Sequence, residues 1–250
     1  MSRQAVSNVS YPVTPGTTVL LSIDCQFGFG AGSWEQVPHA DAAVENFRKA
    51  GRAWRQCGGA VIHVQTAYTP ERAPSGRITD FEPGIAAALA WRECGGDVVH
   101  VQTVYTPERV PSGRITDFEP GIAQALAAGT RAVEAYPDLV QDGDLVVYKT
   151  TFSAVLSSDL VAQLRARGVD TVVTGGLTTP ICVQTTVDGL SMTGLKVIVL
   201  ADACASQAIG PLSAEAAHEA AISRMAYLFA AVQDTDAFVA QVRALQPAAG

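Results

Sequence analysis

The sequence predicts an α/β fold in which a doubly wound, mostly parallel sheet carries helices on both faces. Apolar, β-branched runs bounded by turn residues alternate along the chain with stretches of helical periodicity. The runs are apolar throughout, as in strands buried on both faces, and lack the alternation of a half-exposed strand. Strands of this kind that alternate with helices indicate βαβ units and a three-layer, Rossmann-like arrangement.

The predicted strands are short, and each ends at a turn or at a polar residue. They span residues 17–24, 144–149, 170–176, 195–202 and 230–233, together with two copies of one further strand. Predicted helices span 40–57, 157–167, 180–193, 213–229 and 235–245, and the segments SSDL and LSAEAA supply cap residues before two of them. Ligands of such sheets bind beyond the carboxyl ends of the strands, so the chemistry of the chain is expected at that edge.

The chain contains a tandem duplication. Residues 54–90 recur as residues 91–127, and the two 37-residue copies differ at six positions. Solenoid repeats keep a core pattern and let surface positions drift, whereas turn, charged and apolar positions are all retained here and there is no third copy. Removing one copy leaves 213 of the 250 residues, a suitable size for a single domain. We therefore interpret residues 1–250 as one domain with a recent or engineered duplication of a βα unit.

Each copy predicts a strand (AVIHVQT or DVVHVQT), a loop rich in Pro, Gly, Ser and Arg, and a short helix. Only one copy can fill the position of the original unit. The first copy follows the natural upstream helix and the second precedes the natural downstream segment, so the pattern leaves open which copy docks in the sheet. The spare copy is expected either to add an edge strand and helix or to protrude.

Composition and charge exclude several classes of protein. The chain is 48% hydrophobic and 16% charged, which is enough apolar sequence for a core and argues against general disorder. Its formal charge of −7 argues against nucleic acid as a partner. No apolar run reaches the ~20 residues of a membrane span, and residues 1–16 lack the apolar core of a secretion signal, so a cytoplasmic protein is predicted. Five cysteines without such a signal argue against a disulfide framework.

Three chemically capable side chains follow predicted strands. Asp24 ends the first strand, Lys149 ends the strand at 144–149, and Cys182 lies near the start of the helix at 180–193. The carboxyl ends of parallel strands share one edge of the sheet, so the three side chains are expected close together. Taken singly, each has a simpler interpretation: Asp24 as a turn or cap residue, Lys149 as a solvated residue, and Cys182 as a buried apolar one.

Together the three residues predict cysteine-dependent acyl transfer. A thiol at a helix N-terminus beside an ammonium group favours the thiolate. A nearby carboxylate can take the thiol proton and later give it to a leaving nitrogen, while backbone N–H groups at the turn hold an oxyanion. Two other thiols are interpreted as structural, Cys25 because strand alternation points it away from Asp24 and Cys204 because it falls in a predicted loop.

The same residues carry a resemblance to a known family. The segments LLSIDCQFGF, VVYKTTFSAV and GGLTTPICVQTTVDGLSMTGLKVIVLADACAS resemble the isochorismatase-like cysteine hydrolases, and the resemblance covers essentially the whole chain apart from the extra repeat. It implies that Asp24, Lys149 and Cys182 are the catalytic residues, with Cys182 as the nucleophile. Gly176 and Thr179 match the glycine and the threonine that precede the nucleophile in the family.

The resemblance has further implications. It implies a cis peptide bond between Leu177 and Thr178, with the N–H groups of Thr178 and Cys182 forming the oxyanion hole. It implies a reaction that needs no cofactor. It also implies a homo-oligomer, a dimer or a tetramer, for which the apolar stretch RMAYLFAAV offers either an interface or core packing.

Departures from the family pattern narrow the function. Metal-binding members carry an Asp-x-His segment and a further histidine, whereas no Asp-x-His occurs here, so no metal site is predicted. His63 and its repeat equivalent His100 lie within strands and are interpreted as strand or core histidines. Retention of Cys182 favours hydrolysis of the C–N bond of a small carbamoyl, ureido or simple amide. True isochorismatases cleave a vinyl ether, which needs a general acid but no nucleophile.

Two alternatives stay open beside the cysteine amidohydrolase. In the first, the chain is an isochorismatase-type vinyl-ether hydrolase in which Asp24 is the general acid. In the second, it is a non-catalytic oligomeric scaffold or a homologue inactivated by its duplication. The activity of a variant without Cys182 separates the first alternative from the leading hypothesis, and the absence of ammonia release from any amide indicates the second.

Residues that follow the strand ends are candidates for the substrate pocket. Phe29, Trp34 and Phe152 are candidates for an apolar lid, with core packing as the alternative. Gln26 is a candidate hydrogen-bond partner for substrate or loop. Arg109 of the repeated loop is a candidate for binding a substrate carboxylate, with an ordinary surface position as the alternative.

Overall fold

The computed structural model describes residues 9–30, 33, 36–66, 100–103, 115–119, 121–127, 130–142 and 144–245 of the chain. Within these residues the predicted α/β sheet is confirmed, and every pairing between its seven strands is parallel. The strands are β1 (Thr18–Ile23), β2 (Ala60–Thr66), β3 (His100–Thr103), β4 (Leu145–Tyr148), β5 (Thr171–Leu177), β6 (Lys196–Ala205) and β7 (Ala231–Gln233).

The longer helices fall where apolar periodicity predicts them. They are α1 (Ala40–Gln56), α6 (Leu160–Ala166), α7 (Gln184–Met192), α8 (Ala214–Leu228) and α9 (Thr235–Arg243). Shorter helical segments are η1 (Phe27–Phe29), α3 (Ile115–Phe118), α4 (Ile122–Ala125), η3 (Arg131–Val133), α5 (Ala154–Ser157) and η4 (Thr179–Val183). Ser213 caps α8 by accepting a hydrogen bond from the N–H of Ala216, as the segment LSAEAA predicts. None of the described helices is long and apolar enough to cross a membrane.

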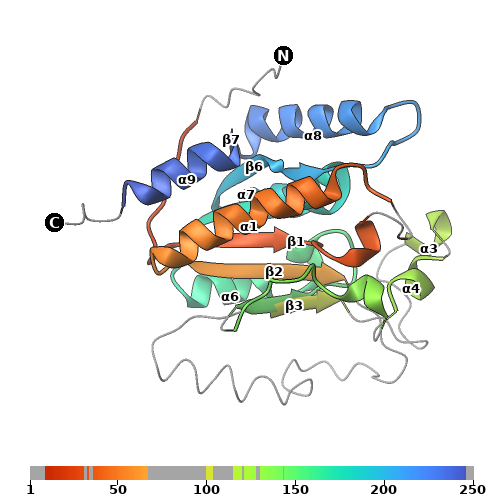
Figure 1. The fold of residues 1–250 in the computed structure, drawn as a ribbon, viewed down its shortest axis with the longest axis horizontal. Helices are drawn as coiled ribbons and strands as arrows, with labels where there is room; N and C mark the ends of the chain where they lie inside the picture. Colours follow the sequence, from red (N-terminus) through yellow and green to blue (C-terminus); the bar gives the residue numbers. More distant parts are fainter. Residues whose placement is uncertain are drawn as a thin grey trace.

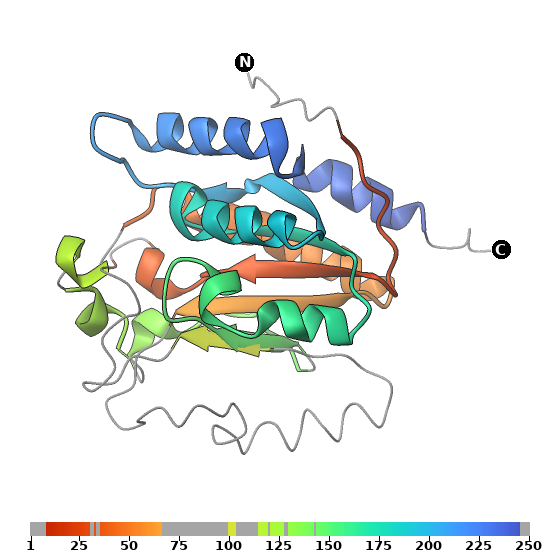
Figure 2. The same cartoon turned by 180° about the vertical axis from the view of Figure 1, so that it is seen from behind.

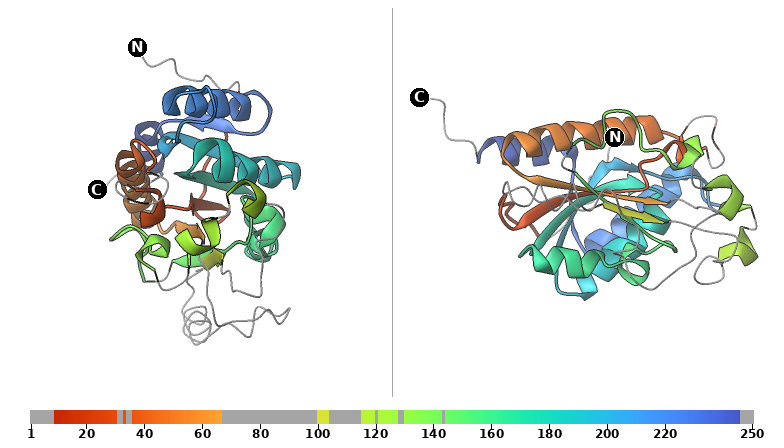
Figure 3. Two further views of the ribbon diagram at one scale, coloured as in Figure 1. Left: turned by 90° about the vertical axis from the view of Figure 1, so that its right-hand side faces the viewer. Right: turned by 90° about the horizontal axis from the view of Figure 1, so that it is seen from below.

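Helices cover both faces of the sheet. α1 and α9 lie on one face (Figure 1) and α6 and α7 on the other (Figure 2), and the three layers are visible when the molecule is seen from below (Figure 3). The strand order is β3-β4-β2-β1-β5-β6-β7. The helix after β1 and the helix after β5 thus lie on opposite faces of two neighbouring strands. This is the switch point at which sheets of this kind bind ligands.

Both copies of the repeat contribute a strand to the sheet. β2, from the first copy, pairs with β1, while β3, from the second copy, pairs with β2 and with β4. β2 and β3 pair in register at equivalent positions of the two copies, from His63 opposite His100 to Thr66 opposite Thr103. The first copy therefore holds the place beside β1, and the second copy adds a strand on the β4 side.

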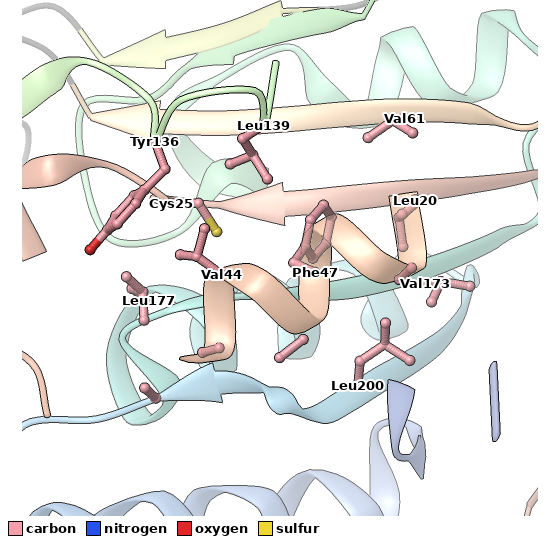
Figure 4. Close-up of a cluster of buried hydrophobic side chains, with 14 of the residues drawn as sticks. Leu20, Cys25, Val44, Phe47, Val61, Tyr136, Leu139, Val173, Leu177 and Leu200 are labelled. Atoms are coloured by element: carbon pink, nitrogen blue, oxygen red, sulfur yellow. The ribbon is translucent and has the colours of Figure 1, made fainter. Parts of the chain in front are cut away.

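The core is divided by the sheet into two layers. Leu20, Phe47 and Val173 belong to the layer between the sheet and α1, which Figure 4 shows. Leu21 and Val172 lie on the opposite side, because successive strand residues point to opposite faces, and they pack with residues of α6 and α7. Since both faces are covered, the strands are apolar throughout, which is the pattern that predicts the fold.

The two cysteines interpreted as structural are both buried. Cys25 lies in the α1-side core, as strand alternation predicts (Figure 4). The prediction that Cys204 lies in a loop is wrong, because it belongs to β6. A register shift opposite Gly176 lets β6 continue past Asp202, which turns outward and accepts hydrogen bonds from Thr235 N (2.8 Å) and Oγ1 (2.7 Å). A charged residue within the segment therefore does not end the strand.

Contacts at the end of α1 explain why the first copy of the repeat begins with a tryptophan and carries a pair of adjacent glycines. The indole of Trp54 is buried, and its Nε1 donates to Ala60 O at 2.9 Å. A Cβ at Gly59 would lie 2.1 Å from the indole ring, so no larger residue fits there. Gly58 has a φ of 75°, in the left-handed region that favours glycine. These contacts connect α1 to β2 in the first copy.

A buried polar network on the α1 side of the sheet surrounds His63. Ser22 Oγ hydrogen-bonds His63 Nδ1, and His63 Nε2 hydrogen-bonds Asp144 Oδ2 at 3.0 Å. Arg55 forms an ion pair with the same carboxylate. Burial lowers the pKa of His63, although the Asp144 carboxylate opposes this change. His63 is therefore a core histidine with both ring nitrogens occupied, and it is neutral at pH 7.

We expect His63 to make the fold sensitive to mild acid. Its pKa is lowered in the folded state, so below an unfolded pKa of about 6.5 the unfolded chain binds a proton that the folded chain does not. The free energy of unfolding should therefore fall between pH 7 and 5, by at most about 1.4 kcal/mol per pH unit for this group. Urea unfolding at several pH values measures the slope. His63→Gln should be less stable at pH 7.5 but show a shallower slope, and an unchanged slope would contradict the assignment.

Candidate active site

The fold brings Asp24, Lys149 and Cys182 together at the carboxyl edge of the sheet. Asp24 directly follows β1 and has a φ of 50°, so the chain turns there. Lys149 directly follows β4, on the other side of β2 from β1. Cys182 lies in η4, which follows β5. The three residues are 0%, 2% and 7% exposed, respectively, so their charges and protons interact with little screening by water.

The Lys149 ammonium is the centre of the cluster. Its Nζ lies 2.8 Å from Asp24 Oδ2 and 3.5 Å from Cys182 Sγ, and it donates to Thr151 O at 3.2 Å. Burial by itself would lower the pKa of Lys149, but the Asp24 carboxylate and the Cys182 sulfur outweigh it and raise that pKa. The lysine is therefore a permanent cation that holds the other two side chains in place and cannot act as the base.

The resting form of Cys182 differs from the sequence-based expectation. Burial raises the pKa of the thiol, the Lys149 ammonium acts in the opposite direction, and Asp24 raises the pKa further through its charge and a hydrogen bond. The Lys149 ammonium favours the thiolate, as predicted, but burial is the larger effect, so Cys182 is a thiol in the resting protein. The thiol needs a base, and the hydrogen-bonded Asp24 carboxylate is the one in contact with it.

The turn that carries Cys182 has the predicted backbone. The peptide bond between Leu177 and Thr178 is cis. Thr178 O accepts hydrogen bonds from the N–H groups of Ile181 and Val183, both at 3.2 Å, which closes the turn into η4. Gly176 has a φ of 143°, and a Cβ there would lie 2.0 Å from Ile23 O. Only glycine therefore lets β5 approach β1 this closely beside Asp24.

Sequence reasoning missed the partner of Thr179. Its Oγ1 hydrogen-bonds Nδ1 of His218, at 2.9 Å, and thereby connects the start of η4 to α8. Burial lowers the pKa of His218, although Glu219 opposes this change. The two residues are 39 positions apart, and nothing in the local pattern of α8 marks His218 as a neighbour of the site. Only the three-dimensional packing of α8 against η4 reveals it.

The segment after Asp24 is held by the stretch that follows the second repeat. Gln26 Nε2 donates to Val133 O at 3.0 Å, and the backbone N–H of Phe27 donates to Glu134 O at 3.1 Å. The rings of Phe27 and Tyr136 stack with their centroids 5.0 Å apart. The buried side chain of Gln26 is thus bonded to the loop, one of the two roles predicted for it.

The remaining candidates for the substrate pocket differ in burial, and two of them lie outside the described residues. Phe29 is buried in the α1-side core, and Phe152 is 36% exposed beyond β4. Trp34 and Arg109 lie outside the described residues. The role of these side chains in substrate binding stays a prediction. Within the described ranges, no three histidine, cysteine or carboxylate side chains converge into a set that could hold a metal ion.

Comparison with known proteins finds a matching family model and several relatives. A family model described as the isochorismatase domain matches residues 81–237, a stretch that contains Lys149 and Cys182. A ureidoacrylate amidohydrolase, RutB, of Methylobacterium radiotolerans is 38% identical over 99 residues, or 39% of this chain and 36% of that protein. The isochorismatase family protein YwoC of Bacillus subtilis is 32% identical over 111 residues, or 44% of this chain and 56% of that protein. The matched stretches thus span less than two thirds of these relatives.

Solved structures match over more of the chain. A cysteine hydrolase from Pseudomonas syringae pv. phaseolicola has a TM-score of 0.71 and 25% identity, and the match covers 98% of this chain and 99% of that one. An N-carbamoylsarcosine amidase from Thermoplasma acidophilum shares the fold, with a TM-score of 0.57 and 23% identity over 88% of this chain and 97% of that one. Together with the geometry at the sheet edge and the match over 81–237, these similarities lead to one conclusion: the chain belongs to the isochorismatase family.

Proposed function

We propose that the protein hydrolyses the C–N bond of a small carbamoyl, ureido or simple amide through a thioester on Cys182. The observation that supports this most is the buried contact of a thiol, a carboxylate and an ammonium at the switch point of the sheet. An ether hydrolase needs only the acid, whereas amide hydrolysis uses all three groups. The amidohydrolase and amidase names of two similar proteins point to the same bond type.

The first chemical step forms a carbon–sulfur bond. The Asp24 carboxylate takes the proton of the Cys182 thiol, with which it is hydrogen-bonded, and the sulfur attacks the amide carbonyl carbon. The carbonyl π electrons move to oxygen and give a tetrahedral oxyanion. The backbone N–H groups of Thr178 and Cys182 hold this oxyanion, and the Lys149 ammonium stabilises the negative charge on sulfur as it develops.

The second step breaks the carbon–nitrogen bond. Asp24 now carries the proton and gives it to the departing nitrogen, which leaves as ammonia or an amine while the oxyanion collapses to a thioester. A water molecule then attacks the thioester, Asp24 accepts its proton, and the acid product leaves as the proton returns to the sulfur. Asp24 thus acts twice as base and twice as acid in one turnover, with Lys149 charged throughout.

A screen for released ammonia tests the proposal. The full chain is incubated with a panel of primary amides, N-carbamoyl compounds and ureido acids, and ammonia is measured with a coupled dehydrogenase assay. With an active compound, rapid acid quenching and mass spectrometry should find the acyl mass on the peptide that contains Cys182. A vinyl ether is incubated in parallel and its cleavage is followed by mass spectrometry, because it releases no ammonia. Turnover of the vinyl ether but of no amide would favour the ether hydrolase, and no turnover at all would favour a non-catalytic role.

A variant that lacks residues 54–90 tests the effect of the duplication. We propose that the strand of the second copy then takes the place of β2, paired with β1 on one side and with β4 on the other, because the deleted and retained sequences are nearly identical. The 213-residue variant should fold and should turn over the same amides at a rate within about tenfold of the full chain. Circular dichroism and the ammonia assay measure both properties. An unfolded variant would show that the second strand is required.

A further inference from the structure

We propose that Ser157 is a positioning residue for Lys149, acting through the backbone carbonyl of Thr151. The inference rests on the function proposed above, because it concerns the geometry of the same cluster. Ser157 lies at the end of α5, eight positions after Lys149, and its hydroxyl bonds the backbone of the preceding loop rather than Asp24 or Cys182. Its effect is therefore carried by the loop between β4 and α5.

The Ser157 hydroxyl is hydrogen-bonded to the backbone of this loop. Its Oγ accepts hydrogen bonds from the backbone N–H groups of Thr150 and Thr151, both at 3.1 Å, and donates to Ser153 O at 2.9 Å. A hydroxyl has two acceptor positions and one donor, so this one is fully used. The three bonds fix the turn that immediately follows Lys149, and no other described side chain bonds both threonine N–H groups.

The orientation of Thr151 then decides where the ammonium sits. Thr151 O accepts from Lys149 Nζ at 3.2 Å, and the same Nζ reaches Asp24 Oδ2 at 2.8 Å and Cys182 Sγ at 3.5 Å. The bond from Thr151 N to Ser157 fixes the peptide plane before Thr151, and the bond from Ser157 to Ser153 O fixes the turn after it, so the Thr151 carbonyl lies between two held points. Loss of the Ser157 hydroxyl frees this carbonyl to rotate, and the ammonium loses an acceptor that holds it against the thiol.

The ammonium lowers the pKa of Cys182 against the effect of burial, so the reactivity of the thiol reports its position. Lys149 and Asp24 are the charged groups that face this thiol. The backbone of Asp24 follows β1 and has no part in the loop after β4. A displacement of the Lys149 ammonium should therefore appear as slower reaction of Cys182 with an alkylating agent at a given pH.

Ser158 offers a matched control. It is the next residue along the chain and has the same chemistry, but its Oγ donates to Ala154 O and accepts from Leu160 N, so it supports the start of α6. These bonds are made to α5 and α6 and not to the loop at residues 150–151. Ser158→Ala removes the hydrogen bond from Leu160 N and lowers stability without a route to Lys149, whereas Ser157→Thr keeps the hydroxyl that the proposal requires.

The test measures the rate at which iodoacetamide alkylates Cys182 at several fixed pH values near neutrality, from the fraction of the Cys182 peptide that carries the added mass. Ser157→Ala should slow labelling about three- to tenfold at each pH, the effect of a thiol pKa that is higher by about half to one unit. Ser157→Thr and Ser158→Ala should keep the labelling rate of the unmodified chain. On an amide that the protein hydrolyses, Ser157→Ala should lower kcat and leave KM within about twofold.

An unchanged labelling rate in Ser157→Ala, or an equally slow one in Ser158→Ala, would overturn the positioning role. Denaturant unfolding of all three variants separates reduced reactivity from loss of fold, and Ser157→Thr keeps the test informative if Ser157→Ala is unfolded. The alkylation assay needs no substrate. Slower labelling of Ser157→Ala in a protein that releases ammonia from no amide would support the positioning of Lys149 while the proposed function fails.

Discussion

Replacement of Cys182 by alanine should abolish amide hydrolysis, with a fall in kcat of at least ~10³-fold. The thiol is the only group at the cluster that can form a covalent bond to the carbonyl carbon, because Lys149 is held as a cation and Asp24 pairs with it. Ammonia release measures the loss. Cys182→Ser should be almost as inactive, because a hydroxyl is a weaker nucleophile whose pKa lies far above that of a thiol.

A cysteine outside the site is the matched control for this experiment. Cys57 follows α1, is partly exposed and contacts Val242 O at 3.5 Å, so Cys57→Ala should retain the activity of the unmodified chain. Iodoacetamide should inactivate the unmodified chain and the Cys57→Ala variant alike. An active Cys182→Ala variant, or a thiol-modified protein with full turnover, would refute the nucleophile and would favour acid catalysis by Asp24 alone.

The sequence predicts those site residues that directly follow a strand or the turn after it. Asp24 and Lys149 directly follow apolar runs, and parallel strands end at one edge, so their proximity follows from the order of strands and helices. Cys182 is found in the same way, from a strand that passes through glycine into a helix. These relations need only the position of a residue along its own element.

The part that sequence does not predict depends on contacts between distant elements. The hydrogen bond of His218 to Thr179 requires α8 to pack on η4, and the loop contact of Gln26 requires the segment at residues 130–136 to lie beside it. The resting thiol of Cys182 reflects burial, which local sequence does not measure. The choice between repeat copies has a different cause: both copies carry nearly the same pattern, so only the connection from α1 favours the first beside β1.

Removal of one member of the buried ion pair should cost more stability than removal of both. Lys149→Met leaves the fully buried Asp24 carboxylate without its ammonium, and breaking such a pair from one side costs about 3–5 kcal/mol. The double variant Asp24→Asn/Lys149→Met has no charge at either position and a similar volume. It should recover most of that loss, because replacing both members of a buried pair by neutral groups is often neutral or stabilising.

Urea unfolding of the two variants and of Asp24→Asn completes a double-mutant cycle. All three should release no ammonia above background, because each lacks the base, the cation or both. The ion pair then affects stability and activity differently. The double variant should be nearly as stable as the unmodified chain, but as inactive as the least stable single variant. A Lys149→Met variant as stable as the unmodified chain would mean that water reaches Asp24. A double variant no more stable than Lys149→Met would show that the methylene chain of Lys149, and not its charge, holds this edge of the sheet together.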